Sequence, residues 1–497
     1  MKSQVLIVGA GPVGLTMAAE LARYGVSVRI VDKAAQRTDK SKAVVLWSRT
    51  LELLDRANCA DAFVAAGNKV DAANIIADKT VIGHINISDV NSPYRFALML
   101  PQSDTERLLE EHLGRLGVET QRQTELSSFE QDESGITAVL RNADGQEEVV
   151  KSDWLIGCDG AHSAVRHSLG LSFLGNTLQS DWILADLHLS GYPLPTTEMV
   201  TYWHEDGVLL IIPMSATRFR IIADLGLSKG GAPVNPTLDQ VQAIIDSRGP
   251  GGMTTDNPIW LSAFRINERK VSDYRSGRAF VVGDAAHVHS PAGGQGMNTG
   301  MQDAFNLAWK LALVCRGESA ESLLDSFSVE RSAVGAEVLK AAGRLTMVAT
   351  MRNHTAQAVR NLFGRLLLGL SPVRKAMVDT MSEVSVGYDH SPLNGPGVHR
   401  GDIPAPGQRL GPIAGQTPVG FGIAPRFALF AARTSRVSRL AVKFPSLLEA
   451  EIRAPLDPNV MLLVRPDGYV ACAAGADDVG IITDYLSAID VSEAVAA

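Results

Sequence analysis

Near its start the chain reads Val5-Leu6-Ile7-Val8-Gly9-Ala10-Gly11-Pro12-Val13-Gly14, and this stretch decides the fold. The four apolar residues predict a short strand, and residues 15–24 predict the helix that follows the turn. Gly9 permits the tight turn, Gly11 lets a pyrophosphate approach the backbone, and Gly14 lets the helix pack closely on the strand. The pattern therefore predicts a dinucleotide-binding site on a Rossmann-like α/β fold.

An acidic residue stands where such a site needs one. A second strand over residues 26–31 ends at Asp32, whose carboxylate falls where a ribose hydroxyl should lie. The N-terminus of the first helix carries about half a positive charge and faces the phosphates. A glycine turn alone could be merely structural, but strand, helix and acid together favour the dinucleotide site.

A second signature occupies residues 278–298, where a buried strand meets Gly283-Asp284, a glycine-rich loop and a helix. Ligands of open α/β sheets bind at loops of this kind, at the carboxyl ends of strands. Asp284 can hold sugar-like hydroxyls, while the glycines within residues 293–296 let backbone N–H groups approach a flat heterocycle. The helix from Met297 directs its positive end at an anion formed there. One extended flavin dinucleotide would explain both signatures.

Composition and charge exclude several other classes. The chain has 497 residues, of which 45% are hydrophobic, so about three domains with sizeable cores are expected. Its net charge of -8 is well interspersed, which predicts neither a nucleic-acid stripe nor a polybasic membrane patch. The four cysteines lie far apart without a CxxC pair, so we expect no metal site and no disulfide framework. From the sequence we expect no signal peptide, no membrane-spanning run and a cytoplasmic location.

The middle of the chain changes pattern. Alternating strands over 199–205, 208–212 and 217–224 indicate an antiparallel sheet, and Thr237 with Gln240 predicts a capping box that opens a helix. Helical periodicity then runs from Met297 to about Glu383, interrupted near Pro372.

These patterns predict an interleaved domain order. Residues 1–170 and 266–390 form the dinucleotide-binding domain, residues 171–265 form an inserted sheet domain to which residues 75–100 contribute, residues 391–415 form a linker, and residues 416–497 form a small α/β unit.

The chain resembles the FAD-dependent aromatic hydroxylases with the para-hydroxybenzoate hydroxylase fold, in particular the phenol hydroxylase and polyketide hydroxylase branch. The resemblance covers nearly the whole chain. It is carried by the glycine turn with Asp32, by Asp159-Gly160 followed by Arg166, by Gly283-Asp284, and most specifically by residues 289–310. It implies that the substrate-binding sheet is the inserted domain and that the C-terminal unit is thioredoxin-like without redox cysteines.

The resemblance also implies residue roles. Asp32 would bind the adenosine ribose, Gln102 the ribityl or pyrophosphate region and Asp284 the ribityl chain, while Pro291 would lie against the flavin. Asp159-Gly160 is associated with both FAD and the nicotinamide cofactor. The residues expected to contact the cofactor are Gly9, Gly11, Pro12, Gly14, Asp32, Lys33, Lys42, Gln102, Asp159, Arg166, Gly283, Asp284, Pro291, Gly294, Gly296, Met297 and Asn298.

The implied reaction hydroxylates a phenolic or polycyclic aromatic compound. NAD(P)H would reduce FAD, oxygen would add as a flavin C4a-hydroperoxide, and its distal oxygen would pass to an electron-rich ring carbon. The sheet would roof the substrate, and Pro291, Tyr202, His204 and Arg220 are the expected catalytic residues. Tyr202 and His204 share one face of their strand, as do Arg218 and Arg220 on theirs, so either pair could orient a phenol.

The sequence departs from the family at two positions. Phenol hydroxylase has an aspartate where this chain has Val44, so the general base is unassigned, and Lys42 replaces the usual arginine without its bidentate fork. His287 and His289 are more typical of loop histidines that satisfy carbonyl groups than of catalysts. A flavin oxidoreductase without oxygen insertion and a noncatalytic nucleotide-binding or assembly protein are the alternatives, and a homodimer is left open.

Overall fold

The computed structural model describes residues 3–491 except 78, 229, 399 and 402. The first large sheet has six strands, in the order β18-β19-β12-β1-β2-β8. Its strands are β1 (Val5–Val8), β2 (Val28–Val31), β8 (Thr120–Gln121), β12 (Trp154–Gly157), β18 (Arg275–Ser276) and β19 (Ala279–Val281). All neighbours run parallel except β18 and β19, so five carboxyl ends meet at one edge. This confirms the expected α/β fold with β1 at its centre.

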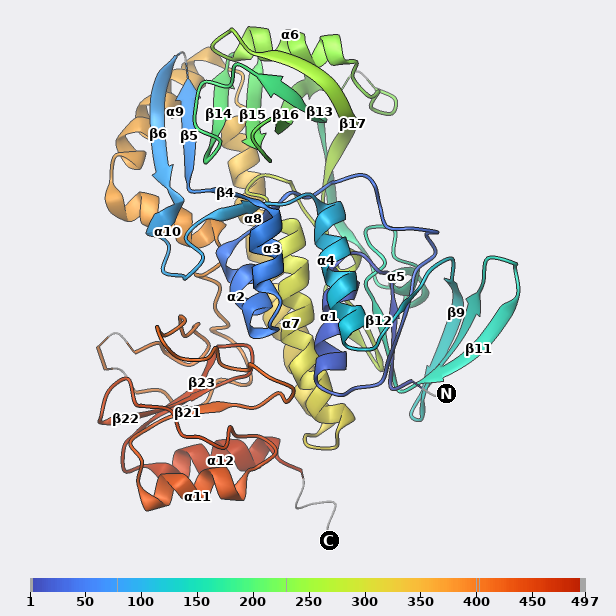
Figure 1. Cartoon of the computed structure of the whole chain (residues 1–497), viewed down its shortest axis with the longest axis vertical. Coiled ribbons are helices and arrows are strands. Elements are labelled where there is room, and N and C mark those ends of the chain that lie inside the picture. Colours follow the sequence, from blue (N-terminus) through green and yellow to red (C-terminus); the bar gives the residue numbers. More distant parts are fainter. Residues whose placement is uncertain (1–2, 78, 229, 399, 402, 492–497) are drawn as a thin grey trace.

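Three helices pack beside this sheet. They are α1 (Pro12–Arg23), α4 (Gln102–Arg115) and α7 (Gly296–Cys315), and α7 runs beside α1 through the centre of the molecule (Figure 1). Apolar residues of β1, α1 and α7 share one core because β1 is fully buried and each helix turns an apolar face inward. Shorter helices follow as α2 (Ser48–Arg56), α3 (Ala60–Ala66) and α5 (Ala164–Ser168).

An eight-stranded sheet stands above this core, in the order β20-β17-β13-β16-β15-β14-β5-β6 (Figure 1). Its strands are β5 (Ala72–Ala77), β6 (Thr80–Asn86), β13 (Leu174–Ser190), β14 (Glu198–His204), β15 (Gly207–Pro213), β16 (Arg218–Leu227), β17 (Thr254–Lys270) and β20 (His287–Val288). The sheet is antiparallel, as expected, apart from the pair β14–β5, which is parallel. β5 and β14 are far apart in the sequence, so they are not joined by a hairpin and can pair in parallel.

The two faces of this sheet carry different cores. One face packs on α6 (Leu238–Arg248), which begins at the predicted capping box of Thr237 and Gln240. The opposite face packs on β3 (Val45–Leu46), α10 (Ser371–Met381) and neighbouring segments. The second face therefore looks toward the six-stranded sheet and its loops.

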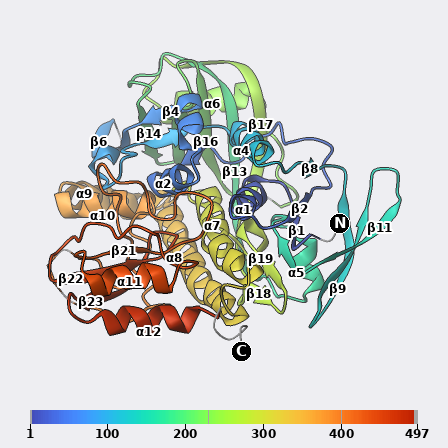
Figure 2. The ribbon, with the colours of Figure 1, turned by 60° about the horizontal axis from the view of Figure 1, so that its bottom comes forward.

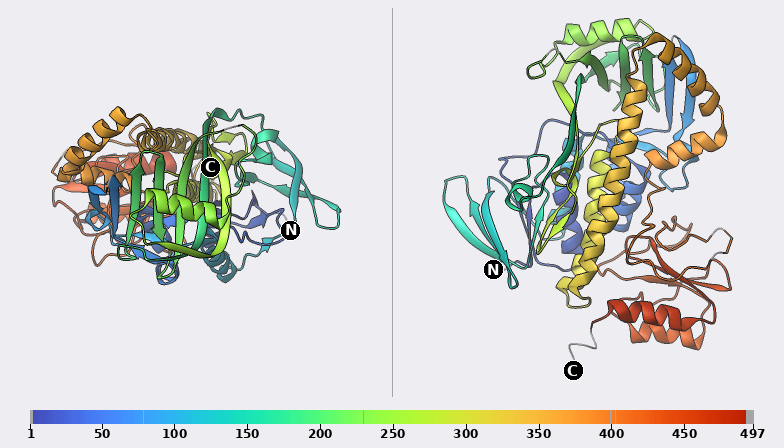
Figure 3. Two further views of the ribbon diagram at one scale, coloured as in Figure 1. Left: turned by 90° about the horizontal axis from the view of Figure 1, so that it is seen from above. Right: turned by 180° about the vertical axis from the view of Figure 1, so that it is seen from behind.

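The helical run after residue 296 is more broken than the sequence predicts. It forms α7, α8 (Asp325–Ala349), α9 (His354–Leu368) and α10. Gly317 follows α7 with a φ of +70°, and Asn353 caps α9 by accepting from the Ala356 amide. The predicted interruption near Pro372 is present between α9 and α10, and Pro372 lies in the first turn of α10, where proline is tolerated. Figure 3 shows α8 reaching from the lower core to the eight-stranded sheet.

Two small sheets and three short 3-10 helices complete this part. The predicted hairpin is present in the sheet of β9 (Glu125–Asp132), β10 (Gly135–Arg141) and β11 (Glu147–Ser152). Another sheet joins β3, β7 (Ala97–Met99) and β4 (Asn68–Val70). The 3-10 helices are η1 (Ile87–Asp89), η2 (Gly283–Ala285) and η3 (Glu321–Leu324).

The C-terminal unit has the predicted order of strand, helix, two strands and helix. Its elements are β21 (Ala428–Phe430), α11 (Ser435–Lys443), β22 (Val460–Val464), β23 (Val470–Gly475) and α12 (Val479–Ile489). Both helices lie on one side of the three-stranded sheet (Figures 1 and 2). All four cysteines are free, as expected.

The expected linker at 391–415 is part of this unit instead. Gly395 and Gly407 donate their amides to the carbonyl groups of Ala471 and Val470, and apolar residues of the segment cover the second face of the small sheet. Its composition resembles a linker, but its backbone is paired and its apolar side chains are packed. None of the helices in the described part of the chain is long and apolar enough to cross a lipid bilayer.

Candidate active site

The glycine turn after β1 has the geometry that its sequence predicts. Gly9 has a φ of +101°, and a Cβ on it would lie 2.5 Å from the Cys158 carbonyl oxygen. A Cβ on Gly14 would lie 1.9 Å from the Gly9 oxygen, so helix and turn touch there. No atom lies within 4 Å of the corresponding position on Gly11. Gly9 and Gly14 are thus required by packing, whereas Gly11 leaves an open approach to the backbone.

The acid after β2 is held against this turn. Asp32 accepts the amide of Ala10 at 2.6 Å and that of Ala34 at 2.8 Å. Lys33 beside it is exposed. These two bonds fix the carboxylate next to the open side of the turn.

The two signatures meet in space. Gly283 has a φ of +62°, and a Cβ on it would lie 2.9 Å from the Val13 side chain. A Cβ on Gly300 would also lie 2.8 Å from Val13. Because β1, β12 and β19 are neighbours, the residues after their carboxyl ends form one continuous edge. Segments some 270 residues apart therefore border one site.

Arg166 ties the loop after β12 to the loop after β19. Asp159 accepts the amides of Ala164 and Val165 with one oxygen, while its other oxygen is buried without a partner in the described structure. Arg166 is buried and donates to the carbonyl groups of Ala285 at 3.0 Å and Ala161 at 2.8 Å. Arg166 is thus a cross-link between two loops of the site.

Asp284 points a free acceptor into this site. No residue in the described parts of the chain donates a hydrogen bond to its carboxylate, which has His287 and Lys42 near it. The residue is exposed to solvent, and desolvation by the neighbouring protein atoms raises the pKa of the Asp284 carboxyl. A ligand hydroxyl would find an unoccupied acceptor here.

Asn298 anchors the glycine-rich loop. Gly293 and Gly294 adopt φ values of +86° and +65°. Asn298 donates to the carbonyl groups of Val45 at 2.9 Å and Gly294 at 3.0 Å, and it accepts the Trp47 amide at 2.9 Å. The Trp47 indole donates to the Gly293 oxygen at 2.9 Å. The loop thus sits on β3 with its open side and the first turn of α7, at Gly296 and Met297, partly accessible.

Gln102 fixes the segment at 41–43 from the other side. The backbone amide of Gln102 donates to the Ser41 hydroxyl at 2.7 Å, and its side-chain oxygen accepts the backbone amide of Ala43 at 3.2 Å. Between these two residues, the Lys42 side chain is exposed. The segment therefore carries a cation beside Asp284 on a fixed backbone.

Arg220 holds the same segment from the eight-stranded sheet. It forms a buried ion pair with Asp186, with Nε 2.7 Å from Oδ1, and donates to the carbonyl groups of Ser41 and Lys42. All three guanidinium nitrogens have protein partners. The expected direct contact of Arg220 with substrate is therefore replaced by a role in holding residues 41–42. Asp186, an acid within the apolar run from Trp182 to Leu187, was the signal that could have revealed this.

Tyr202 and His204 lie on the wrong face for substrate contact. Tyr202 packs with Val241 and Ile245 of α6, whereas its neighbour Trp203 packs in the core that contains Trp47. Side chains alternate along a strand, so Tyr202 and His204 point toward the α6 side, away from the loops described above. Arg218 and Arg220 alternate with residues of the α6 face and point to the loop side.

The two loop histidines have structural partners. His287 lies 2.8 Å from an oxygen of Asp303, and His289 contacts the Ser290 carbonyl at 2.8 Å. Burial lowers the pKa of His289 to about 4, which keeps its ring neutral. Asp303, together with Arg331, which pairs with it, was missed by sequence reasoning although it belongs to the specific run 289–310.

Comparison with known proteins agrees with this geometry. The profile of the FAD binding domain family matches residues 2–342. The 6-methylpretetramide 4-monooxygenase of Streptomyces rimosus is 37% identical over 415 residues, covering 81% of this chain and 74% of that protein. Pentachlorophenol 4-monooxygenase of Sphingobium chlorophenolicum is 33% identical over 340 residues, covering 68% and 63%. The solved anhydrotetracycline hydroxylase of S. rimosus superposes with a TM-score of 0.80 at 26% identity over 99% of both chains.

Proposed function

Because the chain belongs to the FAD-dependent aromatic hydroxylases, we propose that it hydroxylates a phenolic or polycyclic aromatic substrate with NAD(P)H and O2. One observation carries the proposal: the glycine turn, Asp159-Gly160 and Gly283-Asp284 border one site at a single sheet edge. When bound, FAD supplies the redox chemistry, by the oxygen-transfer route that the resemblance implies. The protein supplies binding, orientation and electrostatics.

The residues present fit FAD at three points. Gly11 leaves room for a pyrophosphate at the backbone, and the Asp284 carboxylate lacks a donor from the described residues. The buried second oxygen of Asp159 likewise lacks a partner in the described structure, which is the state expected of a group that a ligand completes. We propose that Asp32 binds the adenosine ribose and Asp284 the ribityl hydroxyls.

The remaining expected contacts keep their proposed roles. Pro291, which is exposed beside the glycine-rich loop, would lie against the flavin, and the first amides of α7 would stabilise negative charge on the reduced ring. Lys42 would add a cation on the backbone that Gln102 and Arg220 fix.

The substrate would lie between this loop and the sheet. Beside the polar group of Asp186, Arg218 and Arg220, the loop-side face of the sheet carries an apolar cluster that includes Val44, Val45 and Trp47. An apolar wall favours a neutral aromatic ring and excludes water from the reacting atoms. Val44 offers no carboxylate, so we assign no general base from the protein.

Three measurements test the proposal. The purified protein should be yellow, substrate should stimulate NAD(P)H oxidation, and one oxygen atom from labelled O2 should enter the product. Stimulated oxidation of NAD(P)H without labelled product would instead support a flavin oxidoreductase that does not insert oxygen. A colourless protein that takes up no FAD would support a noncatalytic binding or assembly role. A panel of phenols assayed with NADH and with NADPH would identify the reductant and narrow the substrate.

The other expectations extend this proposal. We propose that the C-terminal unit is a thioredoxin-like domain without redox chemistry, since its only cysteine, Cys472, is buried and burial raises the pKa of its thiol to about 12. The cytoplasmic location, the domain boundaries other than the linker at 391–415 and the homodimer stay predictions.

A further inference from the structure

The helix α7 has a buried polar face that binding of FAD does not use. After its first turn, it carries a stripe of polar residues that are almost fully buried: Thr299, Gln302, Asp303, Asn306 and Lys310. Their spacing of three or four residues places them on one side of the helix. Buried polar groups at this density need partners, and these partners come from α8, from Glu383 just after α10 and from the C-terminal unit.

Asp303 connects this stripe to the loop that carries Asp284. One of its oxygens accepts the Gly283 amide at 3.1 Å and lies 2.8 Å from the His287 ring. Both residues flank Asp284 within the turn η2 and its exit. Any shift of the Asp303 carboxylate would therefore move the backbone from which Asp284 projects.

Arg331 on α8 contacts three residues on two segments, α7 and the segment that contains Tyr388. Its Nε lies 2.6 Å from the other oxygen of Asp303, and Nη2 donates to the Thr299 carbonyl at 3.0 Å. Its Nη1 donates to the Tyr388 hydroxyl at 3.2 Å. The guanidinium is fully buried, so no water competes for these bonds. A planar guanidinium with fixed donors couples the positions of all three partners.

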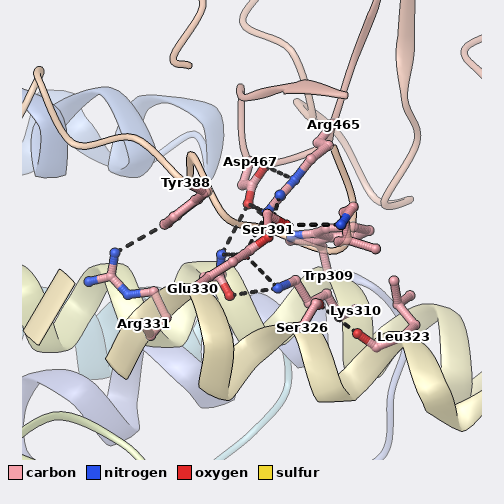
Figure 4. Close-up of polar contacts among 12 residues, drawn as sticks. Trp309, Lys310, Leu323, Ser326, Glu330, Arg331, Tyr388, Ser391, Arg465 and Asp467 are labelled. Atoms are coloured by element: carbon pink, nitrogen blue, oxygen red, sulfur yellow. Dashed lines mark hydrogen bonds and ion pairs between the residues drawn. The ribbon is translucent and has the colours of Figure 1, made fainter. Parts of the chain in front are cut away.

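Tyr388 belongs to the segment that leads into the C-terminal unit. Its amide donates to the Gly407 carbonyl, and its ring lies 4.3 Å from the Tyr469 ring, centroid to centroid. Arg465, in the turn between β22 and β23, lies 5.2 Å from the Tyr388 ring. Arg465 also pairs with Glu330, the neighbour of Arg331 on α8, at 2.6 Å (Figure 4).

We propose that Arg331 is a positioning residue through which the C-terminal unit holds in place the loop that carries Gly283 and Asp284. The unbroken path runs from the C-terminal turn through Tyr388 and Arg331 to Asp303 and the Gly283 amide. Besides its bonds to α7, Arg331 donates to the Tyr388 hydroxyl, and this bond connects the buried ion pair with Asp303 to the segment that leads into the C-terminal unit. The C-terminal unit thus tunes FAD affinity without touching FAD. The inference deepens the proposed function and rests on its FAD site.

Tyr388→Phe tests the path because it deletes one hydroxyl and keeps the ring. The matched control is Tyr485→Phe, which deletes a hydroxyl that donates to the Leu393 carbonyl at 2.9 Å, off the path. FAD titration of the apoprotein, followed by flavin fluorescence, should give a Kd about three- to tenfold higher for Tyr388→Phe than for the wild type. Tyr485→Phe should stay within about twofold, as expected for a bond outside the network.

A second pair guards against an effect of stability alone. Arg331→Lys keeps the charge beside Asp303, whereas Arg331→Met removes it, and both lose the fork. We expect the Kd to rise in the order wild type, Lys, Met, with a shifted visible band of bound flavin in Met at temperatures where thermal unfolding shows each variant folded. Equal Kd values for Tyr388→Phe, Tyr485→Phe and wild type, or Lys and Met variants that bind FAD like the wild type, would overturn the inference. A wild-type protein that takes up no FAD would instead overturn the proposed function.

Discussion

Asp284 is the residue on which cofactor retention should depend most. Its carboxylate receives no hydrogen bond from the described parts of the chain, so ligand hydroxyls would be its donors. Charge-assisted hydrogen bonds contribute about 1.5–3 kcal/mol each. We therefore expect Asp284→Ala to raise the Kd of FAD at least about tenfold, and Asp284→Asn somewhat less. The measurement is flavin absorbance after gel filtration together with a titration of the apoprotein.

Asp144→Asn is the matched control for this prediction. Asp144 is an exposed acid in the hairpin between β10 and β11 that accepts the Gln146 amide, so it has no path to the site. Flavin occupancy that is unchanged in Asp284→Ala would remove the ribityl assignment.

Glu383 makes stability depend on pH. It follows α10, is almost fully buried and accepts bonds from Thr299 and Gln302, and burial raises the pKa of its carboxyl from 4.5 to about 8. Below pH 4.5 the folded and unfolded chains both bind this proton, and no penalty arises. As pH rises from 4.5 to 8, the unfolded chain releases the proton while the folded chain keeps it, so stability falls by at most about 1.4 kcal/mol per pH unit. Above pH 8 the loss is complete.

Glu383→Gln should therefore flatten this pH dependence. Urea unfolding at pH 6 and pH 8.5 should show a smaller loss of stability in the variant than in the wild type, while the exposed Glu205→Gln should match the wild type. A variant whose loss between these two pH values equals that of the wild type would contradict the raised pKa.

At the scale of elements, the glycine turn separates folding from binding. Gly11 has an ordinary φ of -77° and open space around its Cβ position, so Gly11→Ala should leave the apoprotein within about 0.5 kcal/mol of the wild type. The added methyl would occupy the approach of the pyrophosphate, so FAD binding should fall strongly. Gly14→Ala should instead destabilise the fold by at least about 1–3 kcal/mol, because its Cβ would lie 1.9 Å from the Gly9 oxygen. Thermal unfolding with and without FAD distinguishes the two; equal behaviour would contradict the geometry.

The strands β13 and β16 depend on the buried pair of Asp186 and Arg220. Arg220→Met leaves Asp186 with only the partly exposed Arg218 at 3.1 Å, so we expect a loss of about 3–5 kcal/mol. In the double variant Asp186→Leu with Arg220→Met the unpaired charge is gone, and part of the stability should return. Urea unfolding of the two single variants and the double variant measures this coupling. Additive losses would show that the pair is not coupled.

The sequence predicted local elements better than their faces. Periodicity was sufficient for β1, α1 and the capping box of α6, because local spacing determines them. It could show that Tyr202 and His204 share a face but not which face α6 would cover, since that depends on how the chain returns over the sheet. The same limit applies to Arg220, whose partner Asp186 lies 34 residues away.

At the scale of the whole molecule, the sequence predicted the residues that would contact a ligand, but it did not predict the residues that contact one another across the site. Gly9, Gly283 and Asp284 follow a pattern that a phosphate or a sugar imposes, whatever the rest of the chain does. Asp303 and Arg331 have partners from distant segments, so no local spacing reveals them. The prediction of a linker at 391–415 was wrong for a related reason. Its proline and glycine content indicates an irregular backbone, but it does not reveal the distant sheet on which the segment packs.

The buried cluster of Lys310, Glu330, Arg465 and Asp467 joins the C-terminal unit to α7 and α8 (Figure 4). We expect this cluster to make the two parts unfold together. To separate them, all of these bonds would have to break, and charged groups that are now buried and paired would lose their partners. Arg465→Met removes two bonds to Glu330 and leaves two acids with fewer cations, so we expect a loss of about 3–5 kcal/mol.

Calorimetry should show the effect of Arg465→Met as a separate thermal transition of the C-terminal unit. The wild type should give a single main transition, and Arg465→Met should give an earlier one for the C-terminal unit. The control Arg453→Met removes an ion pair with Glu449 that is partly exposed and lies within the unit, and it should cost about 1 kcal/mol or less without splitting the transition. Separate transitions already in the wild type would mean that the cluster does not couple the two parts, and the path through Arg331 would then lose its anchor.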